Sequence, residues 1–130
     1  ECMSAKVAGT IMYKTEQGQY DFLVQPQVDA SYKMLVTNKQ DDQTPLAAVL
    51  IAIQAQLNID VNELRLINLA NINLEGENVS FFVFQWGAHE TDFYTEQLRI
   101  ISEAGFRFAN PSEFTELLDK LEVTSVPHLN

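Results

Sequence analysis

The hydrophobic pattern is clearest between residues 44 and 58, where it predicts one helix with both ends marked. Thr44 is a helix-capping residue, and Pro45 fits the first helical position, where its missing N–H costs nothing. Asn58 readily takes the left-handed conformation that ends many helices. No charged residue lies between these ends, so we expect a buried helix that is covered on more than one side. One face consists of Leu46, Val49, Leu50, Ile53 and Leu57, and the opposite face of Ala47, Ala48, Ile51, Ala52 and Ala55.

The residues before this helix predict a group of strands. Runs rich in apolar and β-branched residues are separated by turns that contain glycine, proline and polar residues. We therefore expect two antiparallel strands joined by a short loop, the second ended by Pro26, and then a shorter strand and a polar loop. The ranges are strand 7–13, turn 17–19, strand 20–25, strand 32–37 and loop 38–43.

A long hairpin is expected after the helix. Residues 60–63 form a turn, and residues 64–74 form a strand whose apolar phase slips near Asn68, which predicts a β-bulge there. A turn over residues 75–78 leads into the strand 79–86, which we expect to be central and covered on both faces because few of its side chains are polar.

The last third of the chain predicts smaller elements. After a loop over residues 87–92, the stretch 93–101 fits either a short helix or irregular structure, and residues 105–109 fit a short strand. An amphipathic helix over residues 110–121 is expected, with Asn110 as its cap and a tail from residue 122 that is loosely attached. Its buried stripe would be Phe114, Leu117, Leu118 and Leu121.

Composition narrows the classes of partner. The length of 130 residues predicts one domain over residues 1–130. The formal net charge of −10 disfavours nucleic acid and anionic membranes as partners, and no apolar run is long enough to span a bilayer. Because Cys2 is the only cysteine, no internal disulfide can form, and we expect a cytoplasmic protein.

The order of these elements resembles the Nudix hydrolase family. Three stretches carry the resemblance: residues 6–11 as the opening strand, residues 44–59 as the helix of the signature box, and residues 106–114 as the closing strand and proline-started helix. The resemblance implies an α/β (α+β) fold, namely an α/β/α sandwich with a mixed sheet, a buried central helix and a C-terminal helix.

The charged and metal-binding residues of the family's signature box are replaced in this chain. The family pattern is G-x5-E-x7-R-E-U-x-E-E-x-G-U, where U is aliphatic. The last two positions fall on Asn58 and Ile59, and Ile53 keeps the earlier aliphatic position. Every charged position is lost. Thr37 replaces the first glycine of the pattern, and Gln43 replaces the first glutamate. Ile51 and Ala52 replace the arginine and the glutamate that follows it. Ala55 and Gln56 replace the two metal-binding glutamates.

These replacements bear directly on the family's reaction. A divalent cation such as Mg²⁺ needs carboxylate oxygens, and water attack on a diphosphate needs that cation. Our first hypothesis is therefore a Nudix-fold protein that has lost metal-dependent pyrophosphohydrolase activity, uses no cofactor and binds a small molecule or a protein. Its ligand-binding residues would be Gln43, Ala52, Ala55, Gln56 and Trp86, and the neutral floor would suit an uncharged ligand.

Two further hypotheses stay open. The second is an unorthodox hydrolase of nucleoside-diphosphate-like substrates that uses Mg²⁺ or Mn²⁺ on relocated carboxylates, with Glu90 and Asp92 as the candidates. These acids also fit a solvated loop, and Trp86 also fits an aromatic cap on the core. The third hypothesis is a homodimer that forms through the apolar outer side of the helix. The histidines His89 and His128 lack a partner at metal-ligand spacing, so zinc is not expected.

Overall fold

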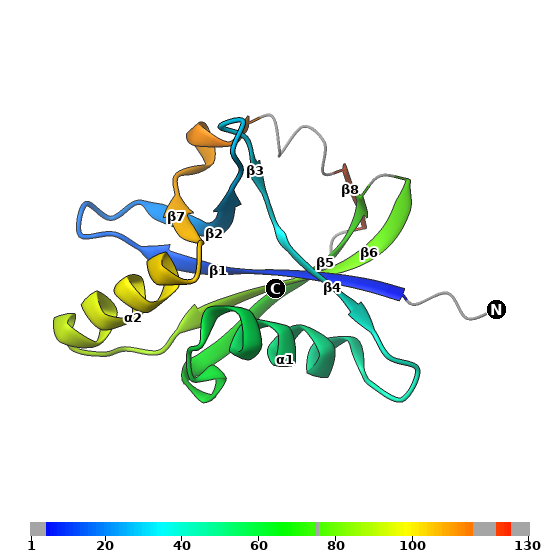
Figure 1. Cartoon of the computed structure of the whole chain (residues 1–130), viewed down its shortest axis with the longest axis horizontal. Coiled ribbons are helices and arrows are strands. Elements are labelled where there is room, and N and C mark those ends of the chain that lie inside the picture. Colours follow the sequence, from blue (N-terminus) through cyan, green and yellow to red (C-terminus); the bar gives the residue numbers. More distant parts are fainter. Residues whose placement is uncertain (1–4, 75, 116–121, 126–130) are drawn as a thin grey trace.

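One mixed sheet organises the computed structural model, which describes residues 5–74, 76–115 and 122–125 (Figure 1). The strand β1 (Ala5–Lys14) lies at its centre and pairs in parallel with β6 (Glu77–Trp86). The other edge of β1 is shared, because its first half pairs with β4 (Leu35–Lys39) and its second half with β2 (Tyr20–Pro26), both antiparallel. The outer pairings are β3 (Tyr32–Lys33) and β7 (Arg107–Ala109) on β2, and β5 (Leu64–Leu74) on β6.

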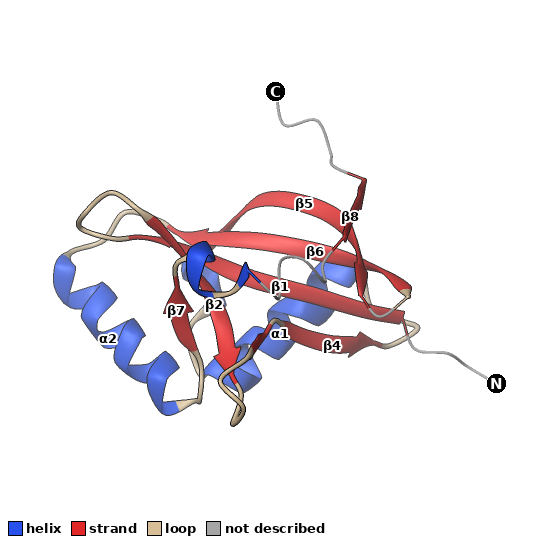
Figure 2. Cartoon of the chain, turned by 90° about the horizontal axis from the view of Figure 1, so that it is seen from above, coloured by secondary structure: helices blue, strands red, loops and turns tan. Residues whose placement is uncertain are grey.

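The helix α1 (Pro45–Leu57) packs on one face of this sheet, as both views show (Figures 1 and 2). Its predicted ends are confirmed. The Thr44 side chain accepts a hydrogen bond from the Ala47 N–H at 3.1 Å, and Asn58 is left-handed with φ 59°. The expectation of cover on more than one side is wrong, because the sheet covers one side only and Ile51 is 56% exposed.

The hairpin formed by β5 and β6 has the structure that the sequence predicts. The register between β5 and β6 shifts between Leu66 and Asn68, which confirms the predicted bulge. Phe82, Val83 and Phe84 are all buried although successive side chains of a strand point to opposite faces. The strand β6 is therefore central and covered on both faces, as predicted. The turn 60–63 is in part a 3₁₀ helix, η1 (Val61–Glu63).

Two predicted strand assignments need correction. The strand expected over residues 32–37 is broken at Met34, because β3 pairs with β2 whereas β4 pairs with β1 and continues to Lys39. The tail expected to be loosely attached begins with β8 (Glu122–Ser125), which pairs antiparallel with β5, so that expectation is wrong for these four residues.

The segment between β6 and β7 forms a helix. The sequence left residues 93–101 open between helix and irregular structure, and α2 (Thr91–Glu103) covers all of them. The helix begins at Thr91, which is inside the loop expected over residues 87–92. Beyond it, Asn110 caps the 3₁₀ helix η2 (Pro111–Glu113) through a capping box, and Phe114 is buried. Residues 116–121, the second half of the predicted helix 110–121, and the residues after 125 lie outside the described residues. No helix in the described part is long and apolar enough to span a bilayer.

Candidate functional site

Among the cavities that the described residues line, two have volumes of about 720 Å³ each. Of the predicted ligand-binding residues, Gln56 lines one of them and Trp86 lines the other. We call the one that Gln56 borders the α1 cavity and the one that Tyr13 and Trp86 border the aromatic cavity. Both volumes are in the range of small-molecule sites in proteins.

The α1 cavity lies between the last turn of α1 and strands on both sides of β1. Among the described residues, its polar lining consists of neutral side chains and two lysines, Lys6 and Lys33, without an aspartate or glutamate. Of the three residues predicted for the cleft floor, Ala52, Ala55 and Gln56, only Gln56 lines this cavity, and Gln43, which was predicted to lie nearby, does not. Ala52 is buried against the sheet, and Ala55 is exposed. The Gln43 side chain accepts a hydrogen bond from the Gln40 N–H at 2.9 Å, so it stabilises the loop before α1.

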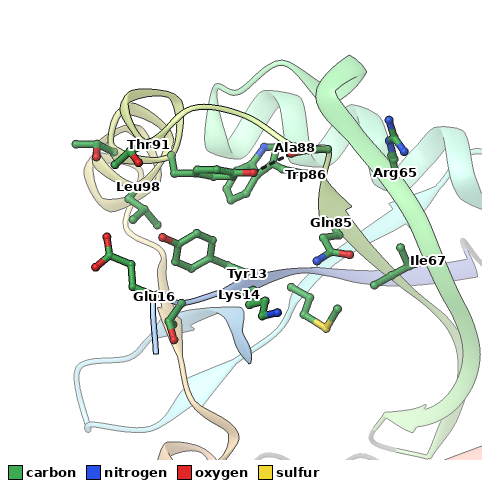
Figure 3. A pocket seen from close by; sticks show the side chains of 15 residues that line it. Tyr13, Lys14, Glu16, Arg65, Ile67, Gln85, Trp86, Ala88, Thr91 and Leu98 are labelled. Atoms are coloured by element: carbon green, nitrogen blue, oxygen red, sulfur yellow. Dashed lines mark hydrogen bonds between the residues drawn. The ribbon is translucent and has the colours of Figure 1, made fainter. Parts of the chain in front are cut away.

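The aromatic cavity lies where the parallel strands β1 and β6 end. Because Met12 pairs with Gln85, Tyr13 and Trp86 follow at the same edge of the sheet (Figure 3). Tyr94 of α2 packs against both rings. The ring centroids of Tyr13 and Trp86 are 6.3 Å apart, and those of Tyr13 and Tyr94 are 5.8 Å apart. These edge-on and tilted contacts are favourable geometries for aromatic pairs.

Hydrogen bonds from Tyr94 hold the loop after β6. The Tyr94 hydroxyl donates to the Gly87 carbonyl at 2.9 Å and accepts from the His89 N–H at 3.1 Å. Trp86 is 6% exposed, and its indole N–H has no hydrogen-bond partner within the described part of the chain. Burial raises the pKa of the Tyr13 phenol, and the carboxylate of Glu16 adds to this effect. The phenol therefore stays neutral to a higher pH than in water.

Charged groups stand at the rim of this cavity. Arg65, Lys14 and Glu16 line it, and the Lys14 ammonium lies 5.9 Å from the centre of the Tyr20 ring. The guanidinium of Arg65 lies beside Gly87 and forms no hydrogen bond or ion pair with any residue that the structure describes. In Figure 3, Tyr13 and Trp86 lie on one side of the cavity and Arg65 lies on the other.

Solved structures share this architecture across most of the chain. The Ap4A hydrolase of C. elegans is 9% identical, with a TM-score of 0.60 over 91% of this chain and 88% of that one. The Nudix hydrolase RenU of M. smegmatis is 12% identical, with a TM-score of 0.60 over 92% of this chain and 76% of that one. A mutT/nudix family protein of Listeria innocua is 9% identical, with a TM-score of 0.57 over 92% and 90%.

The chain has the Nudix fold. This confirms the mixed-sheet α+β fold that the sequence resemblance implied. No protein-family model and no curated protein matches the sequence. Because the sequence identity with these structures is low, the similarity shows the fold alone. The chemistry of the site follows from the side chains of this chain.

The box positions of this Nudix fold do not fit a divalent cation. Ala55 has no ligating atom beyond its backbone, and Gln56 has only a neutral amide at the place where the family pattern carries a second glutamate. Among residues 5–74 and 76–115, no three His, Cys, Asp or Glu side chains lie close enough together to hold a metal ion. The side chains present therefore do not make the cation site that the resemblance implies.

The two relocated carboxylate candidates lie at the start of α2. Glu90 is at the N-cap position without a side-chain capping bond, and Asp92 is in the first turn. Both are exposed, and neither lines the α1 cavity or the aromatic cavity. Their neighbour His89 lies with Nε2 2.9 Å from the Glu63 carboxylate and stacks on Phe93 with ring centroids 3.7 Å apart. This part of the structure joins η1 to α2.

Sequence reasoning singled out Trp86 but missed the residues beside it. Tyr13, Arg65 and Tyr94 come from three elements that are distant in the sequence. A local pattern marks each as an ordinary strand or helix residue, and only the parallel pairing of β1 with β6 brings them together. A signal was present in part, because Tyr13 and Trp86 each end a predicted strand, but the sequence did not reveal that these strands are neighbours.

Proposed function

We propose that this chain is a Nudix-fold binding domain that does not hydrolyse diphosphates by the family's cation-dependent reaction. The observation that carries the proposal is the composition of α1. The helix keeps its two end signals and its packing face, whereas alanine and glutamine occupy the two metal-binding positions of the box. A cation that neutralises charge on a diphosphate would lack anionic ligands on this helix.

The ligand in this proposal is a small molecule in the α1 cavity. Gln56 connects the cavity to the box helix, and the cavity has both polar and apolar lining residues, which suits a compact organic molecule. The amide of Gln56 can both donate and accept a hydrogen bond, whereas an ionised carboxylate can only accept one. Polar recognition by the Gln56 amide and by the two lysines of the lining, Lys6 and Lys33, thus takes the place of binding through a bridging cation.

The experiment combines turnover with binding on the whole chain. A panel of nucleosides and nucleoside diphosphate derivatives is incubated with the protein and Mg²⁺ or Mn²⁺, and released phosphate and mononucleotide are measured. The proposal expects no metal-dependent release above that of a protein-free control. It also expects at least one panel member to raise the melting temperature without metal, because a ligand at 100 times its Kd stabilises a fold by about 2.7 kcal/mol.

Matched variants locate the binding. Gln56→Trp places a large side chain at the α1 cavity, and Gln54→Trp places the same side chain on an exposed neighbouring position that does not line the cavity. We expect the first variant to lose the thermal shift and the second to keep it. Metal-dependent turnover that Glu90→Gln or Asp92→Asn abolishes would instead establish the hydrolase with relocated carboxylates. Equal loss of the shift in both tryptophan variants would overturn the placement of the ligand.

A further inference from the structure

The lining of the aromatic cavity, like that of the α1 cavity, contains more basic than acidic residues. The protein contains eight lysines and arginines against 18 acids, yet Arg65 and Lys14 line the cavity together with one acid, Glu16. The local balance of charge is therefore the reverse of the balance over the whole chain. A cavity with this surplus attracts an anion more readily than the surrounding surface does.

Aromatic rings form the wall opposite the free arginine. Tyr13, Trp86 and Tyr94 pack with centroid distances of 5.8 to 6.3 Å, and Phe108 supports them from behind at 5.5 Å from Tyr13. Such packing holds the rings in place, so a flat ligand meets a wall that loses little conformational entropy on binding. Ile67 and Leu98 add apolar side chains to the lining.

Arg65 is available to a ligand. Its side chain is exposed, and its guanidinium has no acceptor among the residues that the structure describes. A planar guanidinium pairs with a carboxylate or phosphate through two parallel hydrogen bonds. The Arg65 side chain lies beside Gly87, with Arg65 Nε 3.4 Å from the place that a β-carbon added at Gly87 would take.

We propose that the aromatic cavity binds a small planar aromatic anion, with its ring against Tyr13 and Trp86 and its carboxylate or phosphate on Arg65. Recognition then combines apolar contact, which the ring supplies, with one charge-assisted contact at the rim. This site is separate from the α1 cavity, and it does not depend on the function proposed for that cavity. No residue lines both cavities.

The chain carries its own reporter for this site. Trp86 is its only tryptophan, so an amide correlation NMR spectrum of ¹⁵N-labelled protein contains one indole N–H resonance, and that resonance comes from the cavity wall. The probes are 2-naphthoate and 2-naphthyl phosphate, with 2-naphthamide as the neutral control of the same ring. We expect either anion to shift the indole resonance in a saturable manner, and the amide to bind about tenfold more weakly.

Charge variants test the role of Arg65. Arg65→Gln should weaken binding of the anion about tenfold, to the level of 2-naphthamide, and Arg65→Lys should keep part of the affinity. Arg107→Gln is the matched control, because it removes the same charge from β7 outside the cavity lining. The backbone resonances report whether each variant is folded.

Several results would overturn the proposal. They are an indole resonance that neither anion moves at millimolar concentration, equal affinity for 2-naphthoate and 2-naphthamide, and equal weakening by Arg65→Gln and Arg107→Gln. A shift confined to Lys33 and Gln56 would also overturn it, because the probe would then occupy the α1 cavity.

Discussion

Gly9 lies on β1 directly beneath α1, and the substitution Gly9→Ala, which adds one methyl group there, tests how closely the helix packs on the sheet. A β-carbon at this position would lie 2.6 Å from the Val49 Cγ2, a separation that real β-carbons essentially never show. The next nearest atoms, the Phe82 carbonyl oxygen at 3.6 Å and Phe84 Cε2 at 3.9 Å, are at ordinary contact distance. Since Val49 is fully buried, its side chain or the helix itself must move in Gly9→Ala.

The expected cost follows from two opposing terms. Overpacking a core by a methyl group costs about 1–3 kcal/mol. Replacing a strand glycine by alanine recovers about 0.5–1 kcal/mol of backbone entropy, and the φ of Gly9 lies outside the left-handed region, so no strain is added. The net destabilisation is therefore about 1–2 kcal/mol. For a domain of this size, that lowers the melting temperature by roughly 3–8 °C.

Urea and thermal unfolding of four variants and the wild type measure this effect. Gly87→Ala is the matched control, because its new β-carbon would meet only the flexible Arg65 side chain, at 3.4 Å, and should leave stability nearly unchanged. Val49→Ala removes the clashing methyl group, so Gly9→Ala with Val49→Ala should cost less than the sum of the single variants. A Gly9→Ala protein as stable as the wild type, or costs that simply add, would refute this packing.

Three more predictions concern the ends of α1 and the phenol of the aromatic cavity. Thr44→Ala removes the hydrogen bond to the Ala47 N–H and should cost about 1 kcal/mol in urea unfolding, whereas Thr44→Ser should keep most of the stability. Asn58→Ala should cost about 1 kcal/mol because Asn58 is left-handed, whereas Asn58→Gly should be at least as stable as the wild type; equal costs for both would contradict the assigned backbone. The pKa of Tyr13 is raised above 10.0 by burial and then by Glu16, so its contribution to stability is fully present below pH 10 and is lost as the pH rises through the folded pKa. In Tyr13→Phe, the phenolate absorbance should therefore lose a component that titrates above pH 10.0, and loss of a component that titrates at or below pH 10.0 would contradict the burial effect.

The sequence was most informative where structure depends on neighbouring residues. Thr44, Pro45 and Asn58 act within one turn of the chain, and the structure confirms the helix ends that they predict. The bulge near Asn68 follows from the alternation of side chains, which is also local. These features need no knowledge of what packs against them.

The sequence predictions failed where packing or pairing with an element distant in the sequence determines the structure. The apolar composition of α1 predicted cover on more than one side, but Ile51 is exposed because the sheet reaches only one side of the helix. The tail was expected to be loosely attached, yet residues 122–125 pair with β5, a contact between segments about fifty residues apart in the chain. The candidate site was affected in the same way, since Gln56 and Trp86 border different cavities and Arg65 was not identified.

The central claim is that the box helix of this Nudix fold does not hold a divalent cation, and a titration with Mn²⁺ tests it most directly. The electron paramagnetic resonance signal of free Mn²⁺ is recorded while the whole chain is added, with and without a nucleoside diphosphate derivative. We predict that Ala55→Glu with Gln56→Glu lowers the free signal and that the wild-type protein leaves it unchanged. Stoichiometric Mn²⁺ binding by the wild-type protein that Gln56→Trp abolishes, and that Glu90→Gln and Asp92→Asn leave unchanged, would contradict the claim.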